Sequence, residues 1–126
     1  MPEKGSMHWE RSSPELTARF QAVTSTIDGL TQRKMFGETA GFVNGNLVTG
    51  LHNGNWFVRL PEEQQAELRA LPGSGAFEPM AGRPMRGYVV MPPDVVADDA
   101  ALLPWIERAV TFGRSLPSKG SPARQA

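Results

Sequence analysis

The chain is 126 residues long, with 40% hydrophobic and 21% charged residues, a composition typical of one soluble globular domain. Thirteen basic residues balance thirteen acidic ones, so a net charge of +0 supplies no general attraction to nucleic acid or to an anionic membrane. The absence of cysteine excludes disulfides, thiol catalysis and thiolate zinc sites, and two histidines cannot form a three-histidine metal site, so we expect no metal and no cofactor.

The first residues are polar. Residues 1–12 show no periodicity and no apolar signal-peptide core, so we predict a flexible lead-in, with either Met1 or Met7 as the start. No apolar run along the chain approaches the roughly 20 residues that span a bilayer. We therefore expect a cytoplasmic protein without a membrane partner.

The first predicted helix begins at Ser13, where a serine cap is followed by Pro14 and the first-turn acid Glu15. Apolar residues then recur at helical spacing, at Leu16, Phe20, Val23 and Ile27. We expect the helix to end near Asp28 and Gly29, because glycine readily takes the left-handed conformation that closes a helix.

The stretch 33–60 holds two Asn-Gly pairs, Asn44-Gly45 and Asn53-Gly54, between three apolar runs. Both residues of each pair tolerate the positive φ of a two-residue type I′ hairpin turn. The pattern predicts a β-meander with strands over 31–36, 40–43, 47–51 and 56–60.

The second half of the chain is less regular. A short polar helix is predicted over 61–71, and the segment 73–87 is rich in Gly and Pro but apolar enough to be a packed loop. A strand over 88–91 and a helix over 99–116 follow. Pro104 lies too deep for a first-turn position, so that helix either starts late or kinks. Residues 118–126 are predicted to be a disordered tail, which leaves one domain over 13–117.

This element order predicts the α+β class, with a two-layer architecture in which helices pack on a single antiparallel sheet of about five strands.

Five motifs in this order are similar to the TfoX N-terminal domain family, also called Sxy. They are RKMFG (33–37), GFVNGN (41–46), FVRLP (57–61), FEPMxGRPMxxYVVxP (77–92) and PWIERA (104–109). The family takes its name from regulators of DNA uptake in competent bacteria, in which a second, helical domain follows; this chain is expected to be a stand-alone member without that domain. The resemblance implies a fold like that of secretion chaperones.

Four basic residues fall inside the motif-like segments and are candidates for an anion-binding site: Arg33, Lys34, Arg83 and Arg86. Arg83 lies between Gly82 and Pro84, which would present its guanidinium from a constrained loop. Met35 and Tyr88 would add apolar contacts to such a ligand site. The alternatives are solvated charges paired with Glu38, Glu78 or Glu107, and core filling by the Met and aromatic residues.

No residue is assigned a catalytic role, because no strand-turn-helix elbow presents a nucleophile and the paired acids stand at predicted helix starts. Three functions remain. The resemblance favours a small non-enzymatic regulatory or adaptor domain that acts through an unidentified protein partner, with a homodimer as one form. The alternatives are a small-molecule or anion-binding domain and a nucleic-acid-binding accessory protein, the last disfavoured by the neutral charge.

Overall fold

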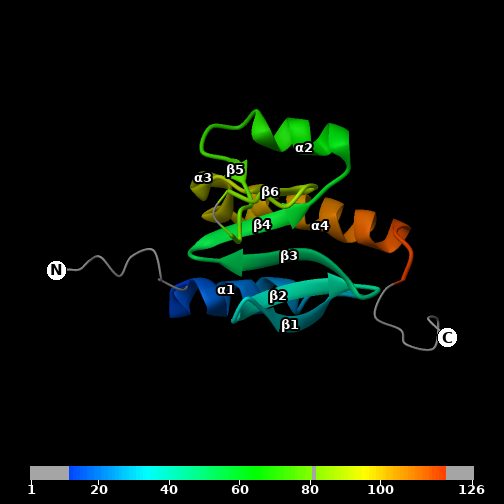
Figure 1. The fold of residues 1–126 in the computed structure, drawn as a ribbon. Coiled ribbons are helices and arrows are strands. Elements are labelled where there is room, and N and C mark those ends of the chain that lie inside the picture. The colour runs from blue at the N-terminus through cyan, green and yellow to red at the C-terminus, as the bar shows by residue number, and fades with distance from the viewer. Residues whose placement is uncertain (1–11, 81, 119–126) are drawn as a thin grey trace.

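The computed structural model describes residues 12–80 and 82–118. Within these ranges the chain forms α1 (Pro14–Thr24), β1 (Thr31–Met35), β2 (Glu38–Val43), β3 (Asn46–His52), β4 (Asn55–Arg59), α2 (Glu62–Arg69), β5 (Gly75–Ala76), β6 (Tyr88–Val90), α3 (Pro93–Val96) and α4 (Asp99–Ser115). The fold is α+β, as the sequence predicts, with one open antiparallel sheet and the helices packed against it (Figure 1). The predicted lead-in and tail lie, except for Ser12 and Ser118, outside the described residues.

The sheet has the strand order β1-β2-β3-β4-β6-β5, and each neighbouring pair is antiparallel. Both Asn-Gly turns are confirmed, with φ of 53° and 78° at Asn44 and Gly45 and of 50° and 82° at Asn53 and Gly54. Paired positive φ values are the signature of a type I′ turn, whose twist matches that of the flanking strands. Local sequence thus determines two of the strand connections.

A β-bulge in β3 places two successive side chains on one face of the sheet. Gly41 pairs with Thr49 and Phe42 pairs with Leu47, which leaves Val48 as the extra residue. Thr49 then accepts a hydrogen bond from the Trp56 indole through its hydroxyl at 2.9 Å and donates one to the Phe57 carbonyl at 2.7 Å. The bulge therefore allows a buried threonine to satisfy a buried tryptophan on the face that the helices cover.

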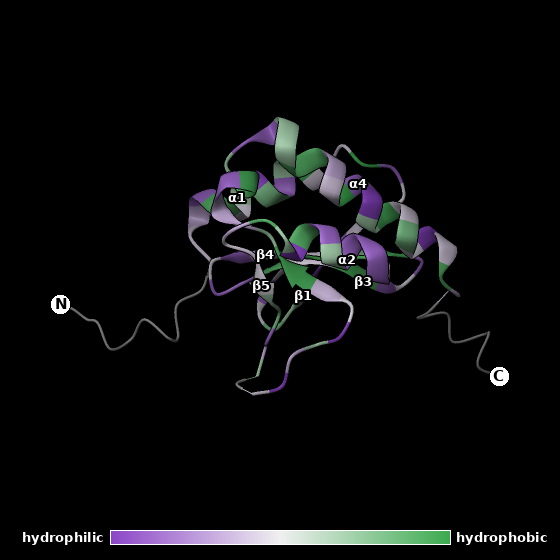
Figure 2. Cartoon of the chain, turned by 90° about the horizontal axis from the view of Figure 1, so that it is seen from above, coloured by the Kyte–Doolittle hydropathy of each residue, from purple (hydrophilic) through white to green (hydrophobic). Residues whose placement is uncertain are grey.

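The main core lies between that face and the helices, and Figure 2 shows α1 and α4 together on one side of the sheet. Its fully buried residues include Phe20 of α1, Trp56 of β4 and Ile106 of α4. The rings of Phe20 and Trp56 meet with centroids 5.0 Å apart. Alternation along β4 sends Trp56 to this core and Phe57 to the opposite face, as predicted.

The long helix α4 approaches the sheet closely at Gly113, where an added Cβ would lie 2.5 Å from Val48 Cγ1. Pro104 lies inside the helix, which begins at Asp99 with an Asp98 side-chain cap. The late start that Pro104 suggested is therefore wrong. Proline has no N–H, so Pro104 donates no helical hydrogen bond to the Ala100 carbonyl. Both residues are exposed, and solvent can donate to that carbonyl instead.

Several predicted boundaries are corrected. The sheet has six strands in the described ranges because the two-residue β5 adds to β6, and the four-residue α3 was not expected. The first helix ends at Thr24 instead of near Gly29, because the carbonyls that follow are used by the 3₁₀-like bonds Ile27 N–H to Thr24 and Leu30 N–H to Ile27. The first strand ends at Met35, one residue earlier than predicted, because Phe36 and Gly37 form a turn between β1 and β2.

Candidate functional site

Within the described ranges, no helix packs on the face of the sheet opposite α1 and α4, and this face carries a second, aromatic cluster. Its buried members are Ala40, Leu47, Phe57, Phe77 and Tyr88, with Met35, Phe42, Met85 and Val90 partly buried against them. The Phe77 ring stacks on Phe57 with centroids 3.9 Å apart, and the Tyr88 hydroxyl donates to the Leu47 carbonyl at 3.0 Å. These contacts hold the loop after β5 against the sheet.

Phe36 stands at the edge of this cluster in an unusual conformation. Phe36 and Gly37 form a third two-residue turn, between the paired residues Met35 and Glu38, with φ of 56° and 77°. A phenylalanine with positive φ is a backbone outlier that costs free energy. The residue is 49% exposed, and its ring makes edge contacts with His52 and Phe77, at centroid distances of 5.6 Å and 6.3 Å.

Sequence reasoning missed this turn because a two-residue turn is recognised by Asn, Asp or Gly at its first position, and Phe36 gives no such signal. The only local indication is Gly37. The chain thus adopts a strained turn at which an aromatic residue is half-exposed beside the aromatic cluster.

Met80, at the tip of the loop, is the second large apolar side chain that the described residues leave exposed, at 64%. Backbone hydrogen bonds pair the two arms of the loop, with Arg83 N–H donating to the Met80 carbonyl at 2.9 Å and Met85 N–H donating to the Phe77 carbonyl at 2.8 Å. Phe77, Met85 and Tyr88 pack against the sheet, as expected for a loop that lies across it. Met80 does not pack there, because it is exposed.

Glu38 joins the start of the domain to this region. Its carboxylate accepts from Ser12 N–H at 3.0 Å and from Asn53 N–H at 2.8 Å, and Gly54 N–H donates to the Ser12 hydroxyl. Burial alone would raise the pKa of Glu38, but the hydrogen bonds from Ser12 and Asn53, helped by His52, hold that pKa below its ordinary value. The buried carboxylate is therefore a structural tie between β2, the β3–β4 turn and the residue before the α1 cap.

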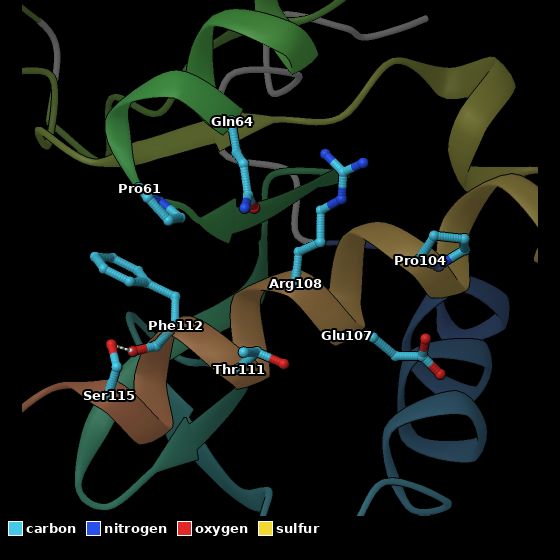
Figure 3. A pocket seen from close by; sticks show the side chains of 8 residues that line it. All are labelled: Pro61, Gln64, Pro104, Glu107, Arg108, Thr111, Phe112 and Ser115. Carbon is cyan, nitrogen blue, oxygen red and sulfur yellow. Dashed lines mark hydrogen bonds between the residues drawn. The ribbon is translucent and has the colours of Figure 1, made fainter.

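A groove of about 490 Å³ lies between α2 and α4 (Figure 3). It is lined by Pro61, Gln64, Pro104, Glu107, Arg108, Thr111, Phe112 and Ser115. Gln64 reaches from α2 toward α4, and Phe112 points from α4 toward Pro61. The Gln64 Oε1 atom is buried without a hydrogen-bond donor in the described parts of the chain. Sequence reasoning did not predict this groove, because it depends on how two helices distant in sequence meet.

A second apolar groove, of about 460 Å³, opens between α1, the start of β4 and α3. Trp56, Met91 and Val96 contribute to its wall, and Arg19 lies at its rim. The Arg19 guanidinium donates to the Val96 carbonyl and forms an ion pair with Asp99 at 2.7 Å. Its charge is thus already compensated within the chain.

Comparison with known proteins identifies the domain. A family model described as the TfoX N-terminal domain matches residues 22–113, most of the chain. The chain belongs to the TfoX N-terminal domain family. Among curated proteins and among solved structures, no match was found.

In this TfoX N-terminal domain, two of the motifs that carried the resemblance contribute to the sheet face opposite α1 and α4, whereas the PWIERA motif lies within α4. The RKMFG motif is the end of β1 and the Phe36-Gly37 turn, and the FEPM and RPM motifs form the two arms of the loop that Phe77 and Tyr88 anchor. The motifs therefore meet in space, although more than forty positions separate Phe36 from Phe77.

Two of the predicted anion-site residues, Arg33 and Arg86, lie at different parts of the sheet. Arg33 lies over the Phe42 ring, with Cζ 4.4 Å from its centroid, on the outer strand β1. Arg86 lines a groove with Glu62, Gln65 and Arg69. It precedes β6 by two residues, and three strands separate β6 from β1 in the sheet. Among the described residues, no hydrogen bond, ion pair or ring contact joins Arg33 or Lys34 to Arg83 or Arg86. An anion site at these four residues stays a prediction.

The apolar members of that predicted site have structural roles in the TfoX N-terminal domain. Met35 is half-buried against the aromatic cluster. Burial raises the pKa of Tyr88 above its ordinary value, although Arg59 beside it acts in the opposite direction. The Tyr88 hydroxyl donates its hydrogen bond to the Leu47 carbonyl. Core filling, the alternative that the sequence left open, is what these contacts support.

No helix in the described parts of the chain combines the length and the apolar character that crossing a membrane requires. No group of three or more His, Asp or Glu residues there has the geometry to hold a metal ion.

Proposed function

We propose that this TfoX N-terminal domain is a non-enzymatic adaptor that docks a protein partner on the sheet face opposite α1 and α4. The observation that carries the proposal is Phe36, a half-exposed aromatic ring presented from a strained turn. Strained backbone is retained where something other than stability requires it. Large aromatic side chains are also the commonest anchors of protein interfaces.

The surroundings of Phe36 support this assignment. Met80 is exposed on the loop that covers the same face, and methionine adapts to partners of irregular shape. His52 and Phe77 pack edge-on against the Phe36 ring, which limits its freedom before a partner arrives. A ring that is already restrained loses less entropy on binding.

The outer strand β1 indicates the chemistry of the partner. It pairs with β2 on one side, and Thr31, Gln32, Arg33 and Lys34 are all exposed. An edge strand of this kind can accept an extended segment of another protein. Antiparallel pairing of two copies about Arg33 would set like charges opposite each other, so an acidic partner segment is favoured over a homodimer.

The experiment places a photoreactive phenylalanine analogue at position 36, and at Thr111 on α4 as control, in cells of the source organism. The proposal expects a protein adduct specific to position 36, identified by mass spectrometry. The adduct is then tested by purifying that protein and measuring its affinity for the unmodified domain. Phe36→Ala and Phe36→Asn should each weaken binding at least about tenfold, the effect of losing an interface anchor. Equal affinity of these variants and the parent domain would remove the proposal.

A further inference from the structure

The groove between α2 and α4 has a chemistry of its own, independent of the proposed adaptor face. Its apolar walls come from Pro61, Pro104 and Phe112, and its polar lining residues are Gln64, Glu107, Arg108, Thr111 and Ser115 (Figure 3). Its volume of about 490 Å³ lies in the range of small-molecule sites. Apolar walls combined with polar groups that can orient a ligand are typical of such sites.

The unpaired atom in this groove is an acceptor. Gln64 Oε1 is shielded from solvent and receives no hydrogen bond from the described residues. A buried acceptor without a donor is unfavourable, and exchanging the amide oxygen and nitrogen would only leave a buried donor in its place. The three rotatable bonds of the glutamine side chain let its amide move into the groove to meet a donor there.

The charge around the groove favours a donor that is also a cation. Arg108 is compensated, because its Nη1 lies 3.0 Å from Glu67 Oε1 and its guanidinium lies 4.5 Å from the Trp105 ring centroid. Arg59, which is held over the Phe112 and Tyr88 rings, does not line the groove. Glu107 lines it, is exposed and forms no ion pair with any described residue. The lining residues thus have one uncompensated charge, and it is negative.

We propose that this groove binds a small amphipathic cation, a primary alkylammonium whose N–H donates to Gln64 Oε1. Its alkyl chain lies against Phe112 and Pro61, and the Glu107 carboxylate, whose side chain points away from Gln64 (Figure 3), attracts the cation through its charge without contacting it. This assigns to the domain a ligand site of opposite charge preference to the anion site that the basic motif residues suggested. It also lies on different elements, α2 and α4 instead of β1 and the loop.

The test is a titration of the full chain at low salt, followed by NMR, with n-hexylamine, n-hexanol and hexanoate as probes. These share one alkyl chain and differ in charge and hydrogen bonding. We expect n-hexylamine to shift the Gln64 side-chain amide and Phe112 ring signals, and to bind at least about tenfold more tightly than n-hexanol, since hydrogen bonds to charged groups have about that effect. Hexanoate should bind most weakly.

Two variants separate the site from a general effect of amines. Gln64→Leu should reduce n-hexylamine affinity about tenfold while folding normally, because it removes an unpaired buried acceptor. Glu107→Gln should reduce it severalfold, whereas Glu63→Gln on α2, outside the groove, should leave it unchanged. Should Gln64→Leu not fold, Gln64→Met preserves the side-chain length and replaces it.

Three results would overturn the inference: equal binding of n-hexylamine and n-hexanol, undiminished binding to the Gln64 variant, or signal changes confined to other elements. None of these outcomes bears on the partner face at Phe36, so the two proposals fail independently.

Discussion

Phe36 occupies a backbone conformation that is unfavourable for a phenylalanine. Its φ of 56° lies in the left-handed region, where asparagine is far better tolerated. We predict that Phe36→Asn is more stable than Phe36→Ala by about 1 kcal/mol, because both variants lack the ring and only alanine keeps the strain. Urea denaturation measures the difference. If the two variants unfold at the same denaturant concentration, the turn is not strained.

Glu38 should make stability depend on pH. Its folded pKa is held below the ordinary value of 4.5, so its stabilisation is complete above that value and is lost as pH falls through the folded pKa. We predict that the stability difference between the parent chain and Glu38→Gln is largest near neutral pH and shrinks as the pH falls below 4.5. Denaturation curves at several pH values measure it. A difference that grows on acidification would contradict the assigned direction.

At the scale of the hairpins, glycine is needed for backbone conformation and not for space. Gly54 has φ of +82° and no atom within 4 Å of an added Cβ, whereas Gly75 in β5 has equal space without positive φ. We predict that Gly54→Ala costs about 1 kcal/mol, because alanine is strained in this conformation. Gly75→Ala is the matched control and should change stability by less than about 0.5 kcal/mol. Equal losses in the two variants would show that the turn is not the cause.

At the scale of helix and sheet, Gly113 sets how closely α4 packs on β3. An alanine there would gain about 1 kcal/mol of helix propensity, but its Cβ would lie 2.5 Å from Val48 Cγ1 and 3.1 Å from Val43 Cβ. We predict a net loss of about 1–3 kcal/mol for Gly113→Ala, as in other overpacked cores. Val48→Ala should cost less in the Gly113→Ala background than in the parent chain. Additive effects of the two changes would mean that the residues do not meet.

For the whole molecule, sheet order predicts a gradient of local stability. Strands β2, β3 and β4 are flanked on both sides, while β1 and β5 are the outer strands. We predict the slowest amide hydrogen exchange in β3 and β4 and faster exchange along β1. In the loop, the Met85 amide, which donates to Phe77, should be protected even though the Met80 side chain nearby is exposed. Rapid exchange at Met85 would show that the loop does not lie stably on the sheet.

The amino-acid sequence by itself determined the class of fold, both Asn-Gly hairpins, the Ser13 cap and the opposite faces of Trp56 and Phe57. Each depends on residues close together in the chain, through turn conformation, capping or strand alternation. The family also followed from the order of short motifs.

Only the tertiary structure decided which side chains from distant parts of the chain lie together on its surface. The strained turn at Phe36 is compatible with an aromatic residue because contacts with His52 and Phe77, from other parts of the chain, accompany it. The same holds for the separation of Arg33 from Arg86, which follows from strand order, and for the groove at Gln64, which follows from the way α2 meets α4. Local propensity carries no information about contacts between distant segments, and those contacts place the side chains available for binding.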